Sequence, residues 1–377
     1  MNLIYVINEY YEEGSCSGVK KKLEIQIQCL EKNNVKVVRY QPHYIFNSKI
    51  TFIFNRLCCP FKMICLRLNS RKEDIIYIRR SQYHLNCLPY LFLLVGKRKY
   101  KVVFEQQDIE HKLPVINKKY IANTIVSIYD RISILIFEKY TKSHADAIVS
   151  VTDEISQYYR KRTRGNLDYL TLGNGISTSS ISVRRNCQLS DSTIHVLCVA
   201  MVAKWHGIDR FIRGLHEYNA HYANSTKIVL HIVGDGPELP HLKDLTNNLG
   251  LNECVIFHGF KSGKELDEMF DMCHVAIGSL AGFRAGLTEF SSLKNREYCA
   301  RGIPIIMASK DVDIPTDWEY VQMIPEDETP VDMNTVVEFA NRVMADSEHP
   351  QKMRRYAEEH LDWMAKMKVL KEFLESL

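Results

Sequence analysis

The sequence predicts an α/β protein with two doubly wound domains, each built on a parallel sheet. Its 377 residues exceed what one ordinary hydrophobic core holds, and they fit two domains of roughly 150 to 200 residues each. Short β-branched runs alternate with longer amphipathic stretches along the chain, which is typical of βαβ units. The alternation stops at a polar break around residues 184–193 and then restarts, so we expect two sheets in tandem.

The predicted strands fall into two sets, one on each side of that break. The first set is LIYVI (3–7), VKVVRY (35–40), DIIYIRR (74–80), KVVFEQ (101–106), DAIVSVT (146–152) and DYLTLGN (168–174). The second set is IHVLCVA (194–200), KIVLHIVG (227–234), CVIFHG (254–259), HVAIGSL (274–280) and GIPIIMAS (302–309). The pattern after residue 360 is helical, and no strand follows it. We therefore expect an N-terminal domain at 1–175, a C-terminal domain at 176–350, and helices at 351–377 that pack across the domains.

Composition and charge narrow the class of protein. Hydrophobic residues make up 46% of the chain and charged residues 25%, as in ordinary globular proteins, which excludes a disordered or fibrous chain. The net charge of +4 is too small for a dedicated nucleic-acid binder, and it suits anionic ligands or an anionic membrane surface. The 11 cysteines form no CxxC pair and several lie in strand-like runs, so we expect reduced thiols in a cytoplasmic protein.

Three apolar stretches bear on membrane contact. The run at residues 3–7 is too short for a signal-peptide core, so we expect no export signal. Residues 51–69 contain several basic side chains and residues 87–95 are too short to span a bilayer, so we expect no transmembrane helix. Residues 51–69 are expected to pack on the first sheet. The alternative is a basic amphipathic helix that rests on the inner face of a membrane.

The most informative stretch runs from Gly278 to Ile306. It begins at the carboxyl end of a predicted strand, passes through a loop, and enters a helix near Ser291 that stops before the next strand. In a parallel sheet such a helix N-terminus faces the ligand-binding edge. Glu289 and Glu297 are eight residues apart with the helix start between them, so that each carboxylate can contact a different part of one extended ligand.

The residue types around this helix start suit a sugar diphosphate. The free backbone amides expected there can donate to phosphate oxygens. They belong to Phe290, Ser291, Ser292 and Leu293. Lys294 adds a cation, and carboxylates accept hydrogen bonds from sugar hydroxyls. The alternative for the carboxylates is structural, because Glu289 can complement the helix dipole and Glu297 can be a solvated helix residue.

This stretch closely resembles glycosyltransferase family 4, the large retaining family with the GT-B fold. The hallmark of that family is a Glu, seven residues and a second Glu, then a small-residue helix end and a G-x-P-x-I strand. Glu289 and Glu297 match the two acids, and the rest of the pattern is also present. It consists of Ala300, Gly302, Pro304 and Ile306. The variant GLTE..SLK.REY.A.GIP is similar to the subgroup that decorates bacterial surface polysaccharides.

The resemblance implies two Rossmann-like domains facing a central cleft, and transfer of a sugar from a nucleotide-diphosphate donor with retention at the anomeric carbon. It implies that Glu289 contacts the hydroxyls of the donor sugar and Glu297 the nucleotide ribose, and that neither a cofactor nor a metal is required. The expected partners are a nucleotide sugar and a glycan or lipid-linked acceptor, with no nucleic acid. The expected pathway is capsule, exopolysaccharide or O-antigen synthesis in the cytoplasm or on the inner membrane face.

The loop after the first strand of the second domain departs from the family. VAMVAKWHGIDRFIRGL at 199–215 aligns with the segment that usually supplies an Arg and a Lys to the diphosphate, but Met201 and His206 stand at these two positions. Lys204 is the expected replacement cation, and His206 can still donate to phosphate. Arg284 and Gly286 precede the acid motif, and Arg284 either contacts phosphate or braces the loop.

Three further segments match the family. GSCSGVKKKLE at 14–24 resembles its glycine-rich loop, where Gly18 would permit a close backbone approach to the donor, and a flexible turn is the equal alternative. GDGPEL at 234–239 lacks the third glycine of a dinucleotide fingerprint, so we expect a structural turn. Asn174 and Gly175 predict a turn with positive φ at the domain junction.

The loop after the fourth strand, FEQQDIEHKLP at 104–114, lies where relatives place polar groups on the acceptor or sugar side. His111 is the candidate to assist the acceptor hydroxyl, and Arg79 at the end of the third strand has similar standing.

Several other chemistries lack support. No HExxH, G-x-S-x-G or Walker P-loop occurs. Asp311 and Asp313 form a nominal DxD metal grip, but it lies outside the expected donor loops. Two alternatives stay open: another GT-B activity, such as a sugar-nucleotide epimerase or a phosphorylase, and a non-catalytic scaffold that binds nucleotide sugar. The departures at Met201 and His206 favour the scaffold.

Overall fold

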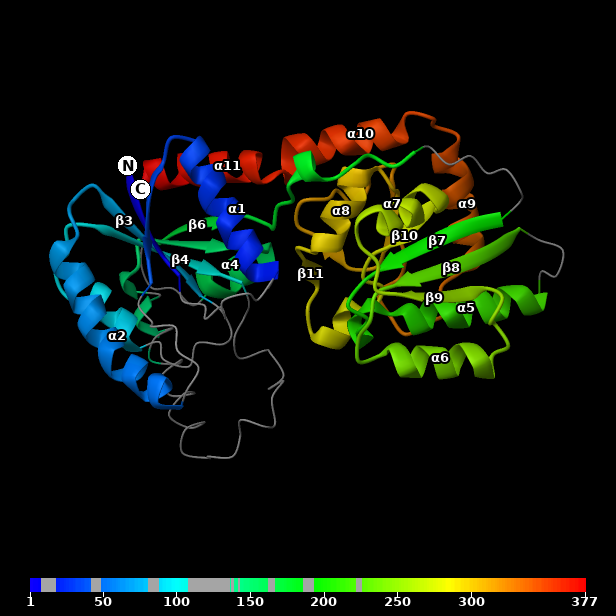
Figure 1. Ribbon diagram of the computed structural model, residues 1–377, viewed down its shortest axis with the longest axis horizontal. Helices are drawn as coiled ribbons and strands as arrows, with labels where there is room; N and C mark the ends of the chain where they lie inside the picture. Colours follow the sequence, from blue (N-terminus) through cyan, green and yellow to red (C-terminus); the bar gives the residue numbers. More distant parts are fainter. Residues whose placement is uncertain are drawn as a thin grey trace. The chain divides into compact units, whose positions relative to one another are not determined.

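The structure is a computed structural model that divides the chain into two compact units. The N-terminal unit comprises Met1–Gly173 together with Trp363–Leu377, and the C-terminal unit comprises Asn174–Asp362 (Figure 1). The structure describes residues 1–7, 18–41, 49–80, 88–107, 136, 139–141, 143–161, 167–185, 193–221 and 226–377. The predicted boundary after residue 175 lies two residues beyond this division. Residues 351–362, which we grouped with the C-terminal helices, stay with the C-terminal unit.

The N-terminal unit contains a six-stranded parallel sheet with the order β2-β1-β3-β4-β5-β6. Its strands are β1 (Asn2–Val6), β2 (Lys36–Tyr40), β3 (Asp74–Arg80), β4 (Lys101–Gln106), β5 (Ala147–Ser150) and β6 (Asp168–Thr171). All six lie within the runs that the β-branched pattern predicts, to within a few residues at each end. Five of the six residues of β4 are buried, as expected for a central parallel strand covered on both faces.

Helices cover both faces of this sheet. They are α1 (Gly18–Lys32), α2 (Lys49–Asn69), η1 (Leu88–Leu93), α4 (Asp153–Arg160) and α11 (Trp363–Ser376). Side chains alternate along β3, so Ile75 and Tyr77 pack with α1 and α11, whereas Ile76 and Ile78 pack with α2 and η1. The helix predicted after residue 360 is therefore α11, which supplies part of the core of the N-terminal unit.

The C-terminal unit repeats this architecture with a sheet of order β14-β12-β10-β7-β8-β9. Its strands are β7 (Thr193–Val199), β8 (Lys227–Val233), β9 (Val255–Gly259), β10 (Val275–Ile277), β12 (Ile305–Met307) and β14 (Val321–Met323). A separate two-stranded sheet pairs β11 (Glu289–Phe290) with β13 (Lys310–Asp311). Five of these strands match the predicted runs, and β11, β13 and β14 were not predicted.

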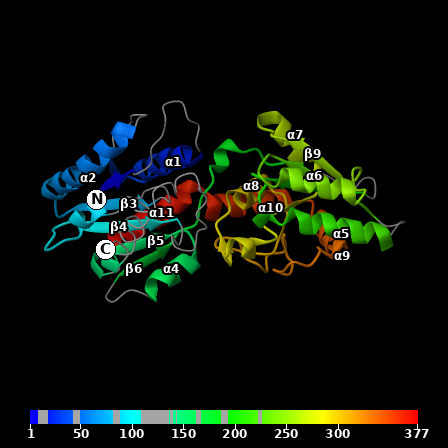
Figure 2. The same ribbon diagram turned by 90° about the horizontal axis from the view of Figure 1, so that it is seen from below.

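The helical elements of the C-terminal unit follow the strands in turn. They are η4 (Thr178–Ser180), η5 (Lys204–His206), α5 (Ile208–His221), α6 (Leu239–Asn248), α7 (Gly263–Met272), η6 (Gly282–Ala285), α8 (Leu293–Arg301), α9 (Met333–Met344), α10 (His349–Tyr356) and a π-helical turn at Ala357–Leu361. Helix α5 packs against α6 and α9, as Figure 2 shows for α5 and α9, whereas α8 packs against α10. One hydrophobic core runs through the whole sheet of this unit.

Two turn predictions have different outcomes. The GDGP segment is a structural turn, as expected: the Val202 amide donates to the Asp235 carbonyl at 2.8 Å, and a Cβ on Gly236 would lie 2.3 Å from the Val202 carbonyl oxygen. The prediction of positive φ at Asn174 and Gly175 is wrong, because neither residue has a positive φ. The chain there instead runs extended, and the Ile176 amide donates to the Leu361 carbonyl at 2.8 Å.

Among the described residues, no helix combines the length and the apolarity needed to cross a membrane. Helix α2, which contains the whole amphipathic stretch at 51–69, packs on the first sheet through Cys59, Met63 and Leu66.

Candidate active site

The C-terminal sheet has its topological switch point between β7 and β10. From β7 the chain adds β8 and β9 on one side and then β10, β12 and β14 on the other, so the loops after β7 and β10 diverge. Ligands of open parallel sheets bind outside the carboxyl ends of the strands at such a point. The two loops contact each other here, because the Leu280 amide donates to the His206 carbonyl at 3.0 Å and the Ala281 amide to the Trp205 carbonyl at 3.3 Å.

Tyr298 of α8 fixes the ends of both strands. Its hydroxyl accepts from the Val199 amide at 2.9 Å and lies 3.4 Å from the Ile277 carbonyl oxygen, and its ring is fully buried. The first turns of α8 are thereby held against the switch point. Glu297, the second acid of the motif, lies on this helix. Strand order and sequence motif therefore indicate the same site independently of each other.

Lys294 directs its ammonium to the carboxyl end of β10. Its Nζ donates to the Gly278 carbonyl at 2.8 Å. The residue is half-buried, but desolvation around its ammonium lowers the pKa to about 8. Burial has the larger effect on the pKa values of the Cys198 thiol, near the end of β7, and of the His206 imidazole, and the charge of the same ammonium lowers both. Lys294 therefore places a cation at the switch point that is still mostly protonated at neutral pH.

His206 is a buried, neutral imidazole at the end of η5. Burial, with a smaller contribution from Lys294, lowers its pKa to about 3. Its Nδ1 lies 3.2 Å from the Ala203 amide, which donates to it, so the ring proton is on Nε2. His206 is thus a neutral hydrogen-bond donor beside the Lys294 ammonium.

Lys204 and Met201 lie on the outside of the same loop. Met201 is 70% exposed and Lys204 is also exposed. The part of Lys204 that has a defined partner is its carbonyl, which accepts from the Gly207 amide at 3.2 Å and from Arg284 Nη1 at 3.0 Å. Gly207 has a left-handed φ of +63°, and a Cβ there would meet Ala281 at 2.9 Å, so only glycine suits this turn.

Arg284 braces the loops around the site. Its guanidinium donates to both oxygens of Asp209, at 2.7 and 2.9 Å, and its Nε donates to Glu328 at 2.9 Å. A second nitrogen also contacts Glu328. The hydrogen bonds to Glu328 and Asp209 raise the pKa of Arg284. Burial alone would raise the pKa of Asp209, but hydrogen bonds from Arg284 lower it. Of the two roles foreseen for Arg284, this geometry favours the brace.

The two motif acids have different surroundings. Glu289 lies in β11, which pairs with β13, and is half-buried. Glu297 lies in the second turn of α8, and its Oε1 accepts from Arg301 Nε at 3.0 Å. Arg301, one turn further along α8, also donates to Asp267 at 2.6 Å. Its guanidinium therefore holds the Glu297 carboxylate in place.

A buried ion pair fixes the start of α8. Arg296 is fully buried and donates to Asp311 at 2.5 Å and also to Asp313. Burial alone would lower the pKa of Arg296, but the two carboxylates raise it. Both acids of the nominal DxD grip therefore serve Arg296, and no group of acids, His or Cys among the described residues has metal-binding geometry. Asp311 also accepts from the Asn295 amide group at 3.1 Å.

Helix α8 begins at Leu293, two residues after the predicted start, with Ser292 as its N-cap. The Ser292 amide points to the Asp311 carboxylate at 3.4 Å, so one of the four amides expected to bind phosphate already has an internal acceptor. The ring of Phe290 fills the space over Gly282, where a Cβ would lie 2.3 Å from the ring. Gly286 ends η6 with a φ of +70°, which explains the glycine by backbone conformation.

Asn174 holds the loop before α8, a role that the sequence did not predict. Its backbone amide donates to Ser291 Oγ at 2.6 Å, and its side chain donates to the Ser291 carbonyl at 2.7 Å. Its own carbonyl accepts from Arg296 Nε at 2.8 Å. Asn174, for which the sequence suggested a turn with positive φ, thus holds the loop between the two motif acids in place.

The predicted residues of the N-terminal unit are described in part. Gly18 is the first residue of α1, whereas His111 lies outside the described residues. Glu105 is buried at the carboxyl end of β4, where Tyr5 donates to it at 3.3 Å and Arg79 lies 3.8 Å away. Arg79 also donates to Gln26 of α1 at 3.3 Å. These contacts give Arg79 and Glu105 a structural role at the carboxyl ends of β3 and β4.

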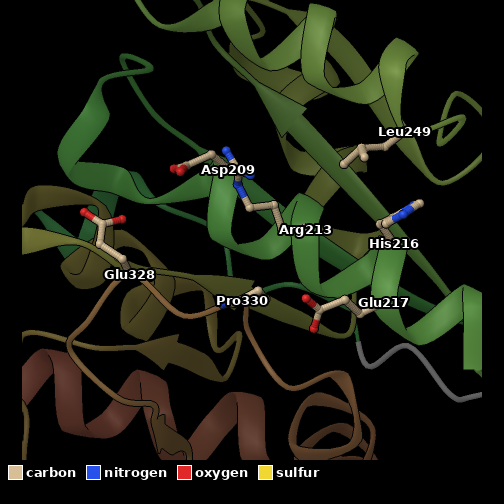
Figure 3. A pocket seen from close by; sticks show the side chains of 7 residues that line it. All are labelled: Asp209, Arg213, His216, Glu217, Leu249, Glu328 and Pro330. Atoms are coloured by element: carbon tan, nitrogen blue, oxygen red, sulfur yellow. The ribbon is translucent and has the colours of Figure 1, made fainter.

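An open cavity of about 490 Å³ lies along α5, outside the site just described (Figure 3). Its lining comprises Asp209, Arg213, His216, Glu217, Leu249, Glu328 and Pro330. None of the predicted donor-binding residues lines it. It shares Asp209 and Glu328 with the Arg284 brace, and both carboxylates are engaged there.

The comparison with protein families decides the identity of the C-terminal unit. Residues 183–360 match the family described as glycosyl transferases group 1. This segment belongs to that family. The chain is a glycosyltransferase that uses a nucleotide-sugar donor, which confirms the predicted family and enzyme class. The matched residues include both acids and the switch-point loops. No curated protein matches the sequence.

Solved structures extend the likeness to the whole chain. HepE from Anabaena in complex with UDP has 13% identity and a TM-score of 0.63, with both chains covered completely. The apo lipopolysaccharide outer core galactosyltransferase WaaB has 15% identity and a TM-score of 0.63, also over both full lengths. A glycosyltransferase from Rickettsia africae has 11% identity and a TM-score of 0.65, covering 100% of this chain and 98% of its own. At these identities the likeness concerns the fold, and it confirms the predicted GT-B fold.

Proposed function

We propose that this glycosyltransferase transfers a hexose or a related sugar with retention at the anomeric carbon, and that Lys294 and His206 hold the diphosphate of its donor. The observation that carries the proposal is the position of Lys294. Its ammonium and the buried His206 lie together where the loops after β7 and β10 meet. A cation and a neutral donor at this point suit a diphosphate leaving group.

Two other basic groups are less suited to the diphosphate. Arg284 already donates to two carboxylates, so a phosphate would have to displace them. Lys204 is exposed on the outer side of its loop. Among the described residues, the hydrogen-bond partner of the Lys294 ammonium is a neutral carbonyl, and a phosphate would offset the desolvation of that ammonium. Lys294 therefore takes the part that the family usually gives to the Arg and Lys of the β7 loop.

The remaining roles follow the motif. Glu289 receives the hydroxyls of the donor sugar, and Glu297, held by Arg301, receives the ribose. The amides at Ser291 and Leu293 are available to supplement Lys294, whereas the Ser292 amide is directed at Asp311. As the bond to the anomeric carbon breaks, negative charge grows on the diphosphate, and Lys294 and His206 stabilise it. No metal is part of this proposal, because the DxD carboxylates are engaged by Arg296.

For the acceptor we propose a glycan or a lipid-linked sugar of a bacterial surface polysaccharide, made on the cytoplasmic side of the inner membrane. Two observations support this. The GLTE..SLK.REY.A.GIP variant is similar to that subgroup, and the chain shares its fold with a lipopolysaccharide galactosyltransferase. His111 is proposed to assist the acceptor hydroxyl, and Gly18 to approach the donor, by the same resemblance.

The test is a screen of the purified chain against UDP-, GDP- and ADP-sugars, with thermal shift and slow donor hydrolysis as readouts. We expect one donor to stabilise the wild type and to be hydrolysed, and the Glu297→Ala variant to lose both effects. Product anomers seen by NMR then report retention. Stabilisation without turnover, even with lipid acceptors, would support the binding scaffold. Conversion of the donor without an acceptor into another nucleotide sugar would support an epimerase.

A further inference from the structure

Helix α2 has two apolar faces on opposite sides. Cys59, Met63 and Leu66 follow i, i+4, i+7 and are buried against the first sheet. Phe61 and Leu68, seven residues apart, are 70% and 76% exposed. At 3.6 residues per turn these two stripes point about half a turn away from each other. A helix that only packs on a sheet needs the first stripe, so the second requires another explanation.

A second segment extends the exposed apolar surface. Phe92 of η1 and Val95 just after it are 41% and 47% exposed, and Ile64 of α2 is 36% exposed. Arg67 joins the two segments, because its guanidinium donates to the Phe92 carbonyl at 2.8 Å and to the Lys97 carbonyl at 3.1 Å. Figures 1 and 2 show α2 at the outer edge of its unit. The five exposed apolar side chains therefore belong to two segments that pack together, and we call the exposed side of these segments the α2–η1 surface.

The charge around the α2–η1 surface is mostly positive, and the acids beside it include Glu73 and Asp146. Residues 58–72 and 88–101 together contain eight Lys and Arg and no Asp or Glu. They are Lys62, Arg67, Arg71, Lys72, Lys97, Arg98, Lys99 and Lys101. The whole chain has a net charge of only +4, so this concentration is local. Arg98 and Lys101 pair with Asp146, while Arg71, Lys72, Lys97 and Lys99 are exposed.

We propose that the α2–η1 surface docks on an anionic lipid bilayer. Exposed Phe and Leu side chains enter the boundary between headgroups and acyl chains, and the surrounding cations bind the anionic headgroups. The apolar stripe alone would suit a protein partner equally well, but eight basic residues with few acids beside them match a surface of uniform negative charge. The proposal goes beyond the transferase reaction and does not depend on the donor site. It would let a protein whose described residues include no membrane-spanning helix bind to a membrane surface.

The experiment is flotation of the full-length chain with vesicles, without any sugar nucleotide. One set contains phosphatidylcholine alone, and the other contains equal parts of phosphatidylcholine and phosphatidylglycerol. We expect binding to the anionic vesicles only, and release when salt is raised from about 0.1 M to about 1 M, because the Debye length falls to roughly 3 Å.

Two double variants separate the apolar contribution to vesicle binding from the electrostatic one. Phe61→Ser with Leu68→Ser removes the most exposed apolar side chains, and we expect binding to weaken at least about tenfold. Lys97→Gln with Lys99→Gln removes two exposed cations, and we expect a loss of about tenfold. The matched control is Phe260→Ser, because Phe260 is 79% exposed on the C-terminal unit. All variants alter exposed side chains, and unchanged thermal unfolding shows that they fold.

The results of these experiments either support or contradict membrane docking. Anionic binding that both double variants weaken, and that Phe260→Ser leaves unchanged, supports the proposal. Absence of binding, equal binding to both kinds of vesicle, or full binding by Phe61→Ser with Leu68→Ser would overturn it. Since no donor is present, none of these results depends on the proposed transferase function.

Discussion

Arg284 and Lys294 lie ten residues apart in the same strand-to-helix stretch, and both are candidate phosphate ligands by charge and position. Their surroundings differ. The Arg284 guanidinium is shared between Asp209 and Glu328, which raises its pKa. The Lys294 ammonium has a carbonyl as its hydrogen-bond partner in a desolvated site, which lowers its pKa to about 8. The Arg284 guanidinium already has carboxylate partners, whereas a bound anion would stabilise the Lys294 ammonium.

The comparison teaches that a basic residue near a ligand motif is best judged by what it already binds. Internal carboxylates make a cation structural, because removing it leaves them unpaired. A cation held by a neutral acceptor in desolvated surroundings can gain free energy when an anionic ligand arrives. The first two of the four predictions below test this difference directly, and all four are in order of expected effect.

The largest effect is expected for Lys294→Met. This change removes the proposed leaving-group cation while keeping a similar apolar stem, so kcat/KM for the donor should fall about a hundredfold or more. Steady-state kinetics measure it, and near-wild-type thermal unfolding shows that the fold is intact. The matched control is Lys264→Met on α7, whose side chain is 91% exposed and should leave kcat/KM unchanged. Equal losses in the two variants would refute the role of Lys294.

Arg284→Met should act on stability more than on catalysis. It leaves Asp209 and Glu328 without their cation, and we expect the free energy of unfolding to fall by about 2 kcal/mol, measured by urea unfolding. The donor KM of the folded variant should change less than that of Lys294→Met. A stable Arg284→Met variant with a strongly raised donor KM would reverse the two assignments.

Glu289→Ala and Glu297→Ala should each lower kcat/KM by at least about tenfold, because each removes charge-assisted hydrogen bonds to the donor. In Glu297→Ala the Arg301 side chain keeps its bond to Asp267, so the helix should remain folded. Circular dichroism and kinetics measure both effects. The control is Glu268→Ala on the exposed face of α7. Full activity in both motif variants would remove the acids from the site.

The smallest effect concerns a row of histidines on the same sheet. His195 lies 2.9 Å from His231, and His231 lies 2.9 Å from His258, measured between ring nitrogens. Burial lowers the pKa of all three, that of His231 to about 4, with Lys227 and Lys261 adding to the effect on His195 and His258. The folded chain therefore resists protons that the unfolded chain accepts below pH 6.5, so stability is lost as pH falls from 6.5 toward 4.

Between pH 7 and pH 5.5 this loss should be about 1 kcal/mol for His231. Urea unfolding at both pH values measures it, and His231→Gln should flatten the pH dependence. His241→Gln is the control, because His241 is 55% exposed and should leave the dependence as in the wild type. An unchanged slope in His231→Gln would show that the row does not control acid stability.

Much of the fold could be predicted because its signals are local. Buried parallel strands are short β-branched runs, and the acid motif occupies one continuous stretch, so strand positions and family followed from neighbouring residues. The strands β11 and β13 are two residues long and carry no periodic signal. The start of α8 was two residues off for a similar reason, because helix ends depend on caps more than on periodicity.

The partners within the site could not be predicted, because they are distant in sequence. Asn174 binds Ser291, 117 residues away, and Arg284 binds Asp209, 75 residues away. The DxD pair was set aside as a metal grip because of its position, but its partner Arg296 was not foreseen. In each case the partner of the residue is a contact that the fold determines and that local sequence does not show.

The most direct measurement of the central claim is calorimetric binding of UDP, GDP and ADP to the wild type and to Lys294→Met at pH 7 and pH 9.5. We expect one nucleotide to bind the wild type, with affinity that falls at pH 9.5 as Lys294 loses its proton above a pKa of about 8. Lys294→Met should bind at least about tenfold more weakly at pH 7 and should lose less affinity between the two pH values. Equal affinity of wild type and variant at both pH values would contradict the account.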